Sequence, residues 1–209
     1  MRKPGSMRAL ETLGRVRLSP NFFMRDFLFS EIAGFYGIPN LPEDPDLAIA
    51  TGRRLCVELL EPLQASFGRI AIRSGYRSPA VTDYGNRRRQ GASVARNAGY
   101  HIWDLRDRRG RRGAAACVVV PWFADRYAEG ADWRALAWWI HDHLPYAHLQ
   151  FYPKLCAFNI LWRERDCDGP ECDGIESFIA PRGTLTKPRM ANFEGRHAAW
   201  CEGFPAFAG

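Results

Sequence analysis

Residues 70–121 constrain the fold of this chain more than any other stretch. The stretch opens with the apolar run I-A-I, which leads directly into S-G-Y-R-S-P at 74–79. Further along, two apolar runs flank a turn rich in Arg and Gly. Short apolar runs bounded by such turn residues are typical of strands and hairpins. We therefore predict a strand at 69–73 and a hairpin formed by strands at 100–105 and 114–120.

The rest of the chain predicts helices and a second strand pair. Apolar residues recur at helical spacing between 45 and 67, which predicts a long helix that Pro62 ends or bends. Residues 22–36 predict an earlier helix, capped by Ser19 or Asn21. The other expected elements are helices at 122–127 and 133–143, a strand pair at 147–152 and 157–162, and either a functional loop or a small helix at 78–98. Separate helices and antiparallel strands predict an α+β fold, a small antiparallel sheet with helices packed on it.

Length and composition predict one folded domain with tails. The chain has 209 residues, of which 46% are hydrophobic, enough for a sizeable core. We expect a frayed or peripheral N-terminal tail at 1–17 and an α+β domain at 18–165. Gly, Pro, Cys and charged residues are spread through 166–209, which predicts a loop-rich extension packed on the same domain.

Charge distribution narrows the expected partners. The net charge of +6 suits an anionic partner. Much of the excess lies in loops at 87–89 and 106–112, and no nucleic-acid recognition motif accompanies it, which argues against nucleic acid. No apolar run reaches the roughly 18 residues that span a bilayer, so no membrane partner is expected. The start of the chain lacks a signal-peptide pattern, which predicts a cytoplasmic location.

Cysteine usage points to a reducing compartment. Cys56 and Cys156 lie in apolar contexts, which predicts buried free thiols. Cys167 and Cys172 are separated by four residues, and this spacing leaves two readings open. They form either a loop disulfide or half of a metal site.

Three features follow one another in the middle of the chain: the S-G-Y-R-S run at 74–78, His101, and the G-A-A-A-C run that ends at Cys117. This order resembles the core of the M15 family of D-Ala-D-Ala carboxypeptidase-like zinc peptidases, in its phage-type branch (subfamily A). The likeness covers roughly 18–162. It implies a hedgehog/DD-peptidase-like fold and a zinc-dependent hydrolase acting on a peptidoglycan-type or D-amino-acid peptide. In such sites three protein ligands hold the zinc and leave one position for water.

The resemblance also implies a metal site that departs from the family. His101 stands at the first zinc ligand, and Cys117 stands where the family has Asp. Thiolate is a competent zinc ligand. The strand that carries Glu and the second His in the family reads A-F-N-I-L-W here, with Asn159 as its only polar residue. We therefore expect His148, on the preceding strand, to be the third ligand.

Other residues complete the expected site. By resemblance Arg77 binds the substrate carboxylate or the reacting carbonyl, and the missing Glu leaves Asp104 as a candidate base, with Asp83 and Glu164 as alternatives. The residues expected to line the cleft are Tyr76, Arg77, Tyr100, Trp103 and Asn159. The resemblance leaves two functions open. The first is a divergent M15-like metallopeptidase. The second is a catalytically inactive M15-like scaffold, phage-derived or not, that serves as a structural module or binds a peptide or small carboxylate.

Overall fold

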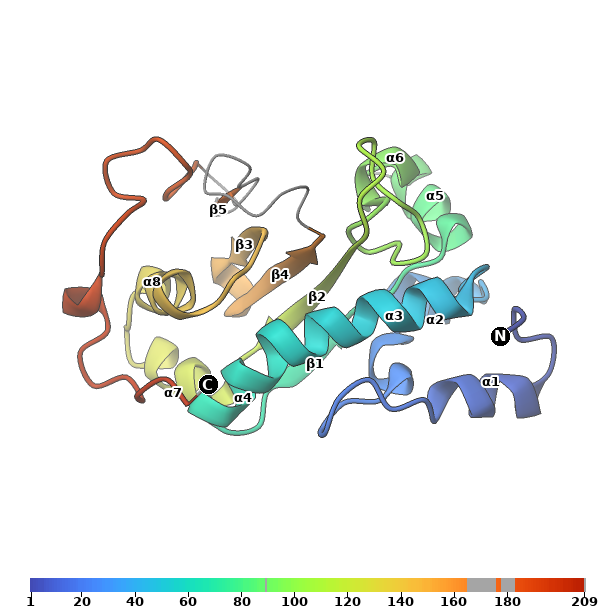
Figure 1. Ribbon diagram of the computed structural model, residues 1–209, viewed down its shortest axis with the longest axis horizontal. Helices are drawn as coiled ribbons and strands as arrows, with labels where there is room; N and C mark the ends of the chain where they lie inside the picture. The colour runs from blue at the N-terminus through green and yellow to red at the C-terminus, as the bar shows by residue number, and fades with distance from the viewer. Residues whose placement is uncertain (89, 165–175, 178–182, 209) are drawn as a thin grey trace.

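The computed structural model describes residues 1–88, 90–164, 176–177 and 183–208, and these residues form a mixed α+β structure (Figure 1). Its helices are α1 (Met7–Gly14), η1 (Met24–Phe27), α2 (Glu31–Tyr36), α3 (Pro45–Leu55), η2 (Cys56–Leu60), α4 (Glu61–Phe67), α5 (Pro79–Arg87), α6 (Val94–Asn97), α7 (Pro121–Ala128), α8 (Trp133–His143), η3 (Pro153–Leu155) and η5 (Ala198–Trp200). Its strands are β1 (Ala71–Ser74), β2 (Gly113–Val119), β3 (His148–Tyr152), β4 (Ala157–Arg163) and β5 (Glu176–Ser177).

The strands form one small sheet in the order β1-β2-β4-β3-β5. The pairs β1–β2, β2–β4 and β3–β4 are antiparallel, and β5 runs parallel to β3. Cys117 of β2 lies opposite Asn159 of β4, which in turn lies opposite Gln150 of β3. The α+β class and the strand pair at 147–152 and 157–162 are therefore confirmed.

One long helical segment covers one face of the sheet. α3 and α4 form one continuous helix, joined by η2, which is a π-helical turn (Figure 1). There the Glu61 N–H donates to the Cys56 carbonyl, five residues back. Pro62 follows this turn and has no N–H to donate, so the wider turn accommodates it and the helix continues. The predicted helix at 45–67 is confirmed, and Pro62 does not end it.

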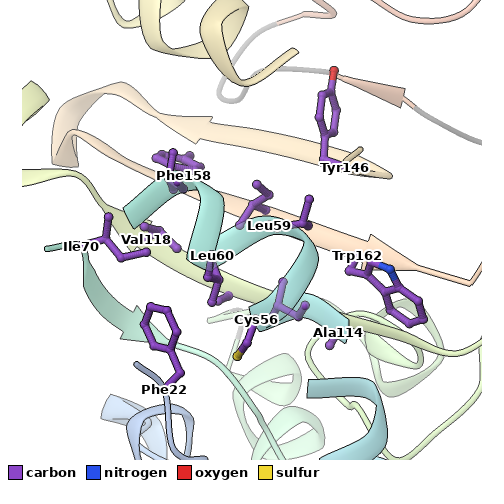
Figure 2. Packing of buried hydrophobic residues seen from close by; sticks show 14 of the residues in the cluster. Phe22, Cys56, Leu59, Leu60, Ile70, Ala114, Val118, Tyr146, Phe158 and Trp162 are labelled. Atoms are coloured by element: carbon purple, nitrogen blue, oxygen red, sulfur yellow. The ribbon is translucent and has the colours of Figure 1, made fainter. Parts of the chain in front are cut away.

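The core lies between this helix and the sheet. Figure 2 shows Leu59 and Leu60 directed toward the β2 and β4 side chains Val118 and Phe158. Each of these side chains is fully buried. Burying one such side chain contributes about 1.5–3 kcal/mol, so this interface accounts for much of the stability of the fold.

Two N-terminal expectations are wrong. Residues 22–36 form η1 and α2 rather than one helix, because the Asp26 carboxylate closes a short turn on the Phe23 N–H and Ser30 caps α2 separately. Phe35 remains 82% exposed, so the aromatic residues do not share one buried face. The tail expected at 1–17 contains α1, whose Leu13 is fully buried in the core.

The predicted hairpin between 100–105 and 114–120 is also wrong. Residues 100–105 form turns after Gly99, whose φ is +62°. The Ala115 N–H of β2 does donate to the Tyr100 carbonyl, at 2.8 Å. The Tyr100 and Ile102 N–H groups, however, both donate to the Asn97 carbonyl at 2.9 Å, so this segment turns back on α6 instead of extending along β2. The segment at 78–98 contains α5 and α6, so the helical alternative holds there.

The C-terminal residues 183–208 pack along α8 and α4 with little regular structure. The Trp139 indole N–H donates to the Pro205 carbonyl at 3.1 Å. The Phe204 ring lies against Phe67 and Trp122. Within the described residues, no helix is both long and apolar enough to cross a membrane.

Candidate functional site

The two faces of the sheet differ in chemistry. Along β2, β4 and β3, alternate side chains enter the helix-covered core. The intervening side chains lie on the opposite face. There the strand register lines up a polar row of Ser74, Cys117, Asn159 and Gln150 across β1, β2, β4 and β3. This polar row is the foundation of the candidate site.

A cavity of about 410 Å³ opens over the row. It lies between the polar row, the start of α2 and the segment after β1. The residues that line it are Ser30, Glu31, Ile32, Arg73, Ser74, Arg77, Gln90, Cys117, Tyr152, Leu155 and Asn159. The sequence-predicted residues Arg77, Cys117 and Asn159 are thus brought together here, and we call this space the Arg77 cavity.

Local hydrogen bonds hold Arg77 at the cavity. The Arg77 N–H donates to the His101 carbonyl at 2.9 Å, and its guanidinium Nη2 donates to Ser74 Oγ at 3.4 Å. Asn40 braces the same turn: its amide nitrogen donates to the Tyr76 carbonyl, and its amide oxygen accepts the Ser78 N–H. The half-buried Arg77 has no carboxylate within ion-pair distance among the described residues.

The cavity floor is neutral and hydrogen-bonded. Burial raises the pKa of the Cys117 thiol, although the nearby Arg73 and Arg77 cations act in the opposite direction. Cys117 is therefore a thiol at neutral pH. Asn159 donates to the Tyr152 hydroxyl at 2.9 Å, and that hydroxyl donates to Gln150 Oε1 at 3.4 Å. These groups offer hydrogen bonds without adding charge.

His101 lies beneath this site and is 2% exposed. Its Nδ1 is 2.8 Å from the Gly75 carbonyl, which can only accept, so Nδ1 carries the proton and Nε2 is left as the acceptor. Burial, together with the Arg77 charge, lowers the pKa of His101 to about 3. His101 is therefore neutral across the physiological range. It sits in a turn, not on the strand that the sequence predicted.

The residues that the structure describes do not fit a catalytic zinc site. No group of three His, Cys, Asp or Glu side chains converges to hold a metal ion anywhere in the described ranges. The strand register separates two of the expected ligands. Cys117 lies opposite Asn159, whereas His148 lies opposite Leu161, two residues further along β4. The expected set of His101, Cys117 and His148 is thus not assembled. Cys167 and Cys172 lie outside the described residues.

His148 and Tyr100 line a neighbouring cavity instead. The Tyr100 hydroxyl is 3.2 Å from Nδ1 of His148, and the two rings are packed together. Burial, reinforced by the Arg163 charge, lowers the pKa of His148 to about 4. Neither residue lines the Arg77 cavity.

The remaining predicted site residues have structural positions. Tyr76 and Trp103 are fully buried in the core, where they cannot contact a ligand. Asp104 is also buried, and its Oδ2 accepts the N–H groups of Glu43 and Asp44 just before α3. None of these three residues lines the Arg77 cavity, because each of them faces the protein interior. The alternative bases Asp83 and Glu164 pair with Arg87 and Arg112.

Sequence reasoning missed Arg73 and Tyr152, both of which line the cavity. A signal for Tyr152 was available. His148, Gln150 and Tyr152 alternate with Leu149 and Phe151, which predicts one polar strand face. Arg73 lies in the short strand β1, one residue before its end, and nothing local distinguishes it from a solvent-exposed Arg.

Comparisons with family models, curated proteins and solved structures find no match to this chain.

Proposed function

We propose that the chain is a binding module whose Arg77 cavity holds a small carboxylate or the C-terminal carboxylate of a peptide. The observation that carries the proposal is the position of Arg77, a half-buried cation without a carboxylate partner among the described residues. Withdrawing a cation from water is unfavourable unless an anion compensates it. The planar guanidinium fork matches a carboxylate in a two-point interaction, so a ligand carboxylate would compensate Arg77.

The surrounding residues support a small ligand. Arg73 lies at the rim and pairs with Glu31, which also lines the cavity, at 3.6 Å, so this pair leaves Arg77 as the unneutralised cation among the described lining residues. Asn159 and the Tyr152 hydroxyl offer neutral hydrogen bonds, and Ile32 and Leu155 offer apolar contact. The volume of about 410 Å³ lies within the range of small-molecule pockets, roughly 300–1,000 Å³.

In this proposal, the scaffold of the binding module has the hedgehog/DD-peptidase-like fold that the M15 resemblance implies. The cytoplasmic location stays a prediction. Zinc-dependent hydrolysis is not part of the proposal, because the described side chains over the cavity do not supply three suitable ligands.

Calorimetric titration with N-acetylated dialanine, in its D,D and L,L forms, tests the proposal. The C-terminal amides of the same peptides are the matched ligands without a carboxylate. Arg77→Gln removes the fork, and we expect the acids to bind at least about tenfold more weakly to it. Arg69→Gln, at an exposed site outside the cavity, is the matched control and should bind as the wild type does.

Two results would contradict the proposal. Equal binding of acids and amides would show that no carboxylate is recognised. Unchanged affinity in Arg77→Gln would place any binding elsewhere. The same samples are assayed chromatographically for free alanine, with and without added zinc. Alanine release that Arg77→Gln abolishes would favour the metallopeptidase prediction over the binding module.

A further inference from the structure

Residues 192–207 lie along α8 and are held there by side chains, and we call them the C-terminal strap. Phe193 packs on His141 of α8, and Phe207 packs on Trp139. The backbone hydrogen bonds of the strap stay within the C-terminal segment, as in the short turn η5. Attachment of the strap to α8 therefore depends on individual side-chain contacts.

His197 makes the polar contact between the strap and α8. Its Nδ1 lies 2.7 Å from Asp142 Oδ1, and its Nε2 lies 3.1 Å from the Asn192 carbonyl oxygen. A carboxylate oxygen and a carbonyl oxygen only accept, so both ring nitrogens of His197 have to donate. A neutral imidazole has one N–H. This arrangement is complete only when His197 is the doubly protonated cation.

The surroundings of the ring favour that cation. The His197 ring is stacked on the Trp138 indole, with 3.7 Å between centroids and 11° between planes. An aromatic face attracts a cation placed over it. Asp142 also accepts the His197 backbone N–H, at 2.6 Å, and both side chains of the pair are largely buried. A charged hydrogen bond is stronger in such a place than at the surface.

Two other ionisable groups lie beside the pair, and both are neutral near pH 7. Ring centroids of His141 and His197 are 5.6 Å apart. His141 needs a single proton, because its Nε2 faces the Phe193 carbonyl and its Nδ1 faces the Tyr146 hydroxyl, which can donate as well as accept. Burial lowers the pKa of His141. Burial, together with the Asp142 charge, raises the pKa of the Cys201 thiol to about 11.

We propose that His197 and Asp142 form a proton-dependent latch, which closes the C-terminal strap on α8 and releases it as the pH rises. Loss of one proton from His197 leaves one N–H for two acceptors and removes the attraction to the Asp142 carboxylate. The closed strap therefore binds the proton more tightly than the open strap does. An ordinary imidazole changes charge near pH 6.5, so the latch is fully present below this value and is lost as the pH rises above it.

Opening the latch uncovers aromatic surface. Trp138 and Trp139 of α8 are buried, and the strap residues His197 and Phe207 lie against them. The strap is thus a pH-controlled cover for this part of α8. None of these residues lines the Arg77 cavity, so the inference does not depend on the proposed function.

Chymotryptic cleavage after Phe193 and Trp200, measured by mass spectrometry between pH 6 and pH 9.5, tests the latch. Cleavage of a segment that opens transiently follows the population of its open form. His197→Gln can still donate one hydrogen bond but takes up no proton. We expect the wild type to be cut roughly tenfold to hundredfold more slowly than His197→Gln at pH 6, and less than about threefold more slowly at pH 9.5. The protease's own pH dependence cancels in this ratio.

Asp142→Asn is the second test, because it removes the charge and keeps the shape of the side chain. It should be cut faster than the wild type at pH 6 and should show a weaker pH dependence. Arg196→Gln, at the exposed position next to His197, is the control and should be cut as the wild type is at every pH. A ratio of wild type to His197→Gln that stays constant, or that changes in the opposite direction, would overturn the proposal. So would equal cleavage of the wild type and both variants at pH 6.

Discussion

Gly75 stands in the S-G-Y-R-S run because Phe27 leaves no room for a side chain. A Cβ at position 75 would lie 2.8 Å from the Phe27 Cβ and 3.1 Å from its Cα. The Gly75 carbonyl also accepts the His101 hydrogen bond. Because the Phe27 backbone would have to move, we expect Gly75→Ala to lower the free energy of unfolding by about 1–3 kcal/mol, measured by urea denaturation.

Gly5→Ala is the matched control for this prediction. Gly5 lies outside any helix, and a Cβ there would meet nothing within 4 Å. Its free energy of unfolding should stay within about 0.5 kcal/mol of the wild type. Equal effects of the two substitutions would mean that the contact with Phe27 does not explain the glycine.

The buried His101 predicts a pH dependence of stability. Its pKa falls from 6.5 to about 3 on folding, so between these values the unfolded chain binds the proton more tightly. Stability is therefore fully present above pH 6.5 and is lost as the pH falls toward 3. The loss approaches about 1.4 kcal/mol per pH unit for one proton. Urea denaturation between pH 6.5 and 5 measures it.

His101→Asn isolates this contribution, because its amide can still donate to Gly75 but does not titrate. We expect the wild type to lose about 1–2 kcal/mol more than His101→Asn over this pH range. His141 and His148 also have lowered pKa values, so they too reduce stability as the pH falls. Their contributions are the same in the wild type and in His101→Asn, and they cancel in the difference between the two proteins. Parallel pH profiles would contradict the prediction.

Elements with a clear period were predictable, and elements defined by their neighbours were not. The helix at 45–67 and α8 show repeated apolar spacing, and both form as expected. Residues 100–105 look equally apolar, but the Tyr100 and Ile102 N–H groups donate to the Asn97 carbonyl, so this segment forms turns instead of a strand beside β2. Strand pairing depends on residues far apart in the sequence, so local pattern alone could not exclude the hairpin.

The contact between α8 and the C-terminal residues rests on His197. Its ring stacks on Trp138 with 3.7 Å between centroids, and its Nδ1 lies 2.7 Å from Asp142 Oδ1. The His197 N–H also donates to Asp142 Oδ2 at 2.6 Å. We expect His197→Ala to lower stability by about 1–2 kcal/mol and to speed proteolysis within 183–208. Arg196→Ala, next to it and exposed, is the control and should be cut at the wild-type rate.

At the scale of the whole molecule, the site was predictable where it followed strand register. Cys117 and Asn159 share the cavity because one row crosses β1, β2 and β4, and Arg77 reaches it because it follows Ser74, the β1 member of that row, by three residues. Tyr76, Trp103 and Asp104 were misplaced because whether a residue near a turn faces the ligand or the core depends on distant packing. Neighbours such as Phe27, against Trp103, decide that orientation.

The burial of Leu13 makes α1 part of the folding unit rather than a tail. Leu13 belongs to the same core cluster as Leu59 under the sheet. We expect Leu13→Ala to lower the free energy of unfolding by about 2–5 kcal/mol, as for other buried leucines, with a single transition and an unchanged urea m-value. Met7→Ala, at an exposed site on the same helix, should leave stability nearly unchanged.

If α1 were peripheral, Leu13→Ala would instead leave the main transition in place. Urea denaturation followed by tryptophan fluorescence and far-UV circular dichroism distinguishes these cases, because the two signals must coincide if α1 and the sheet unfold together.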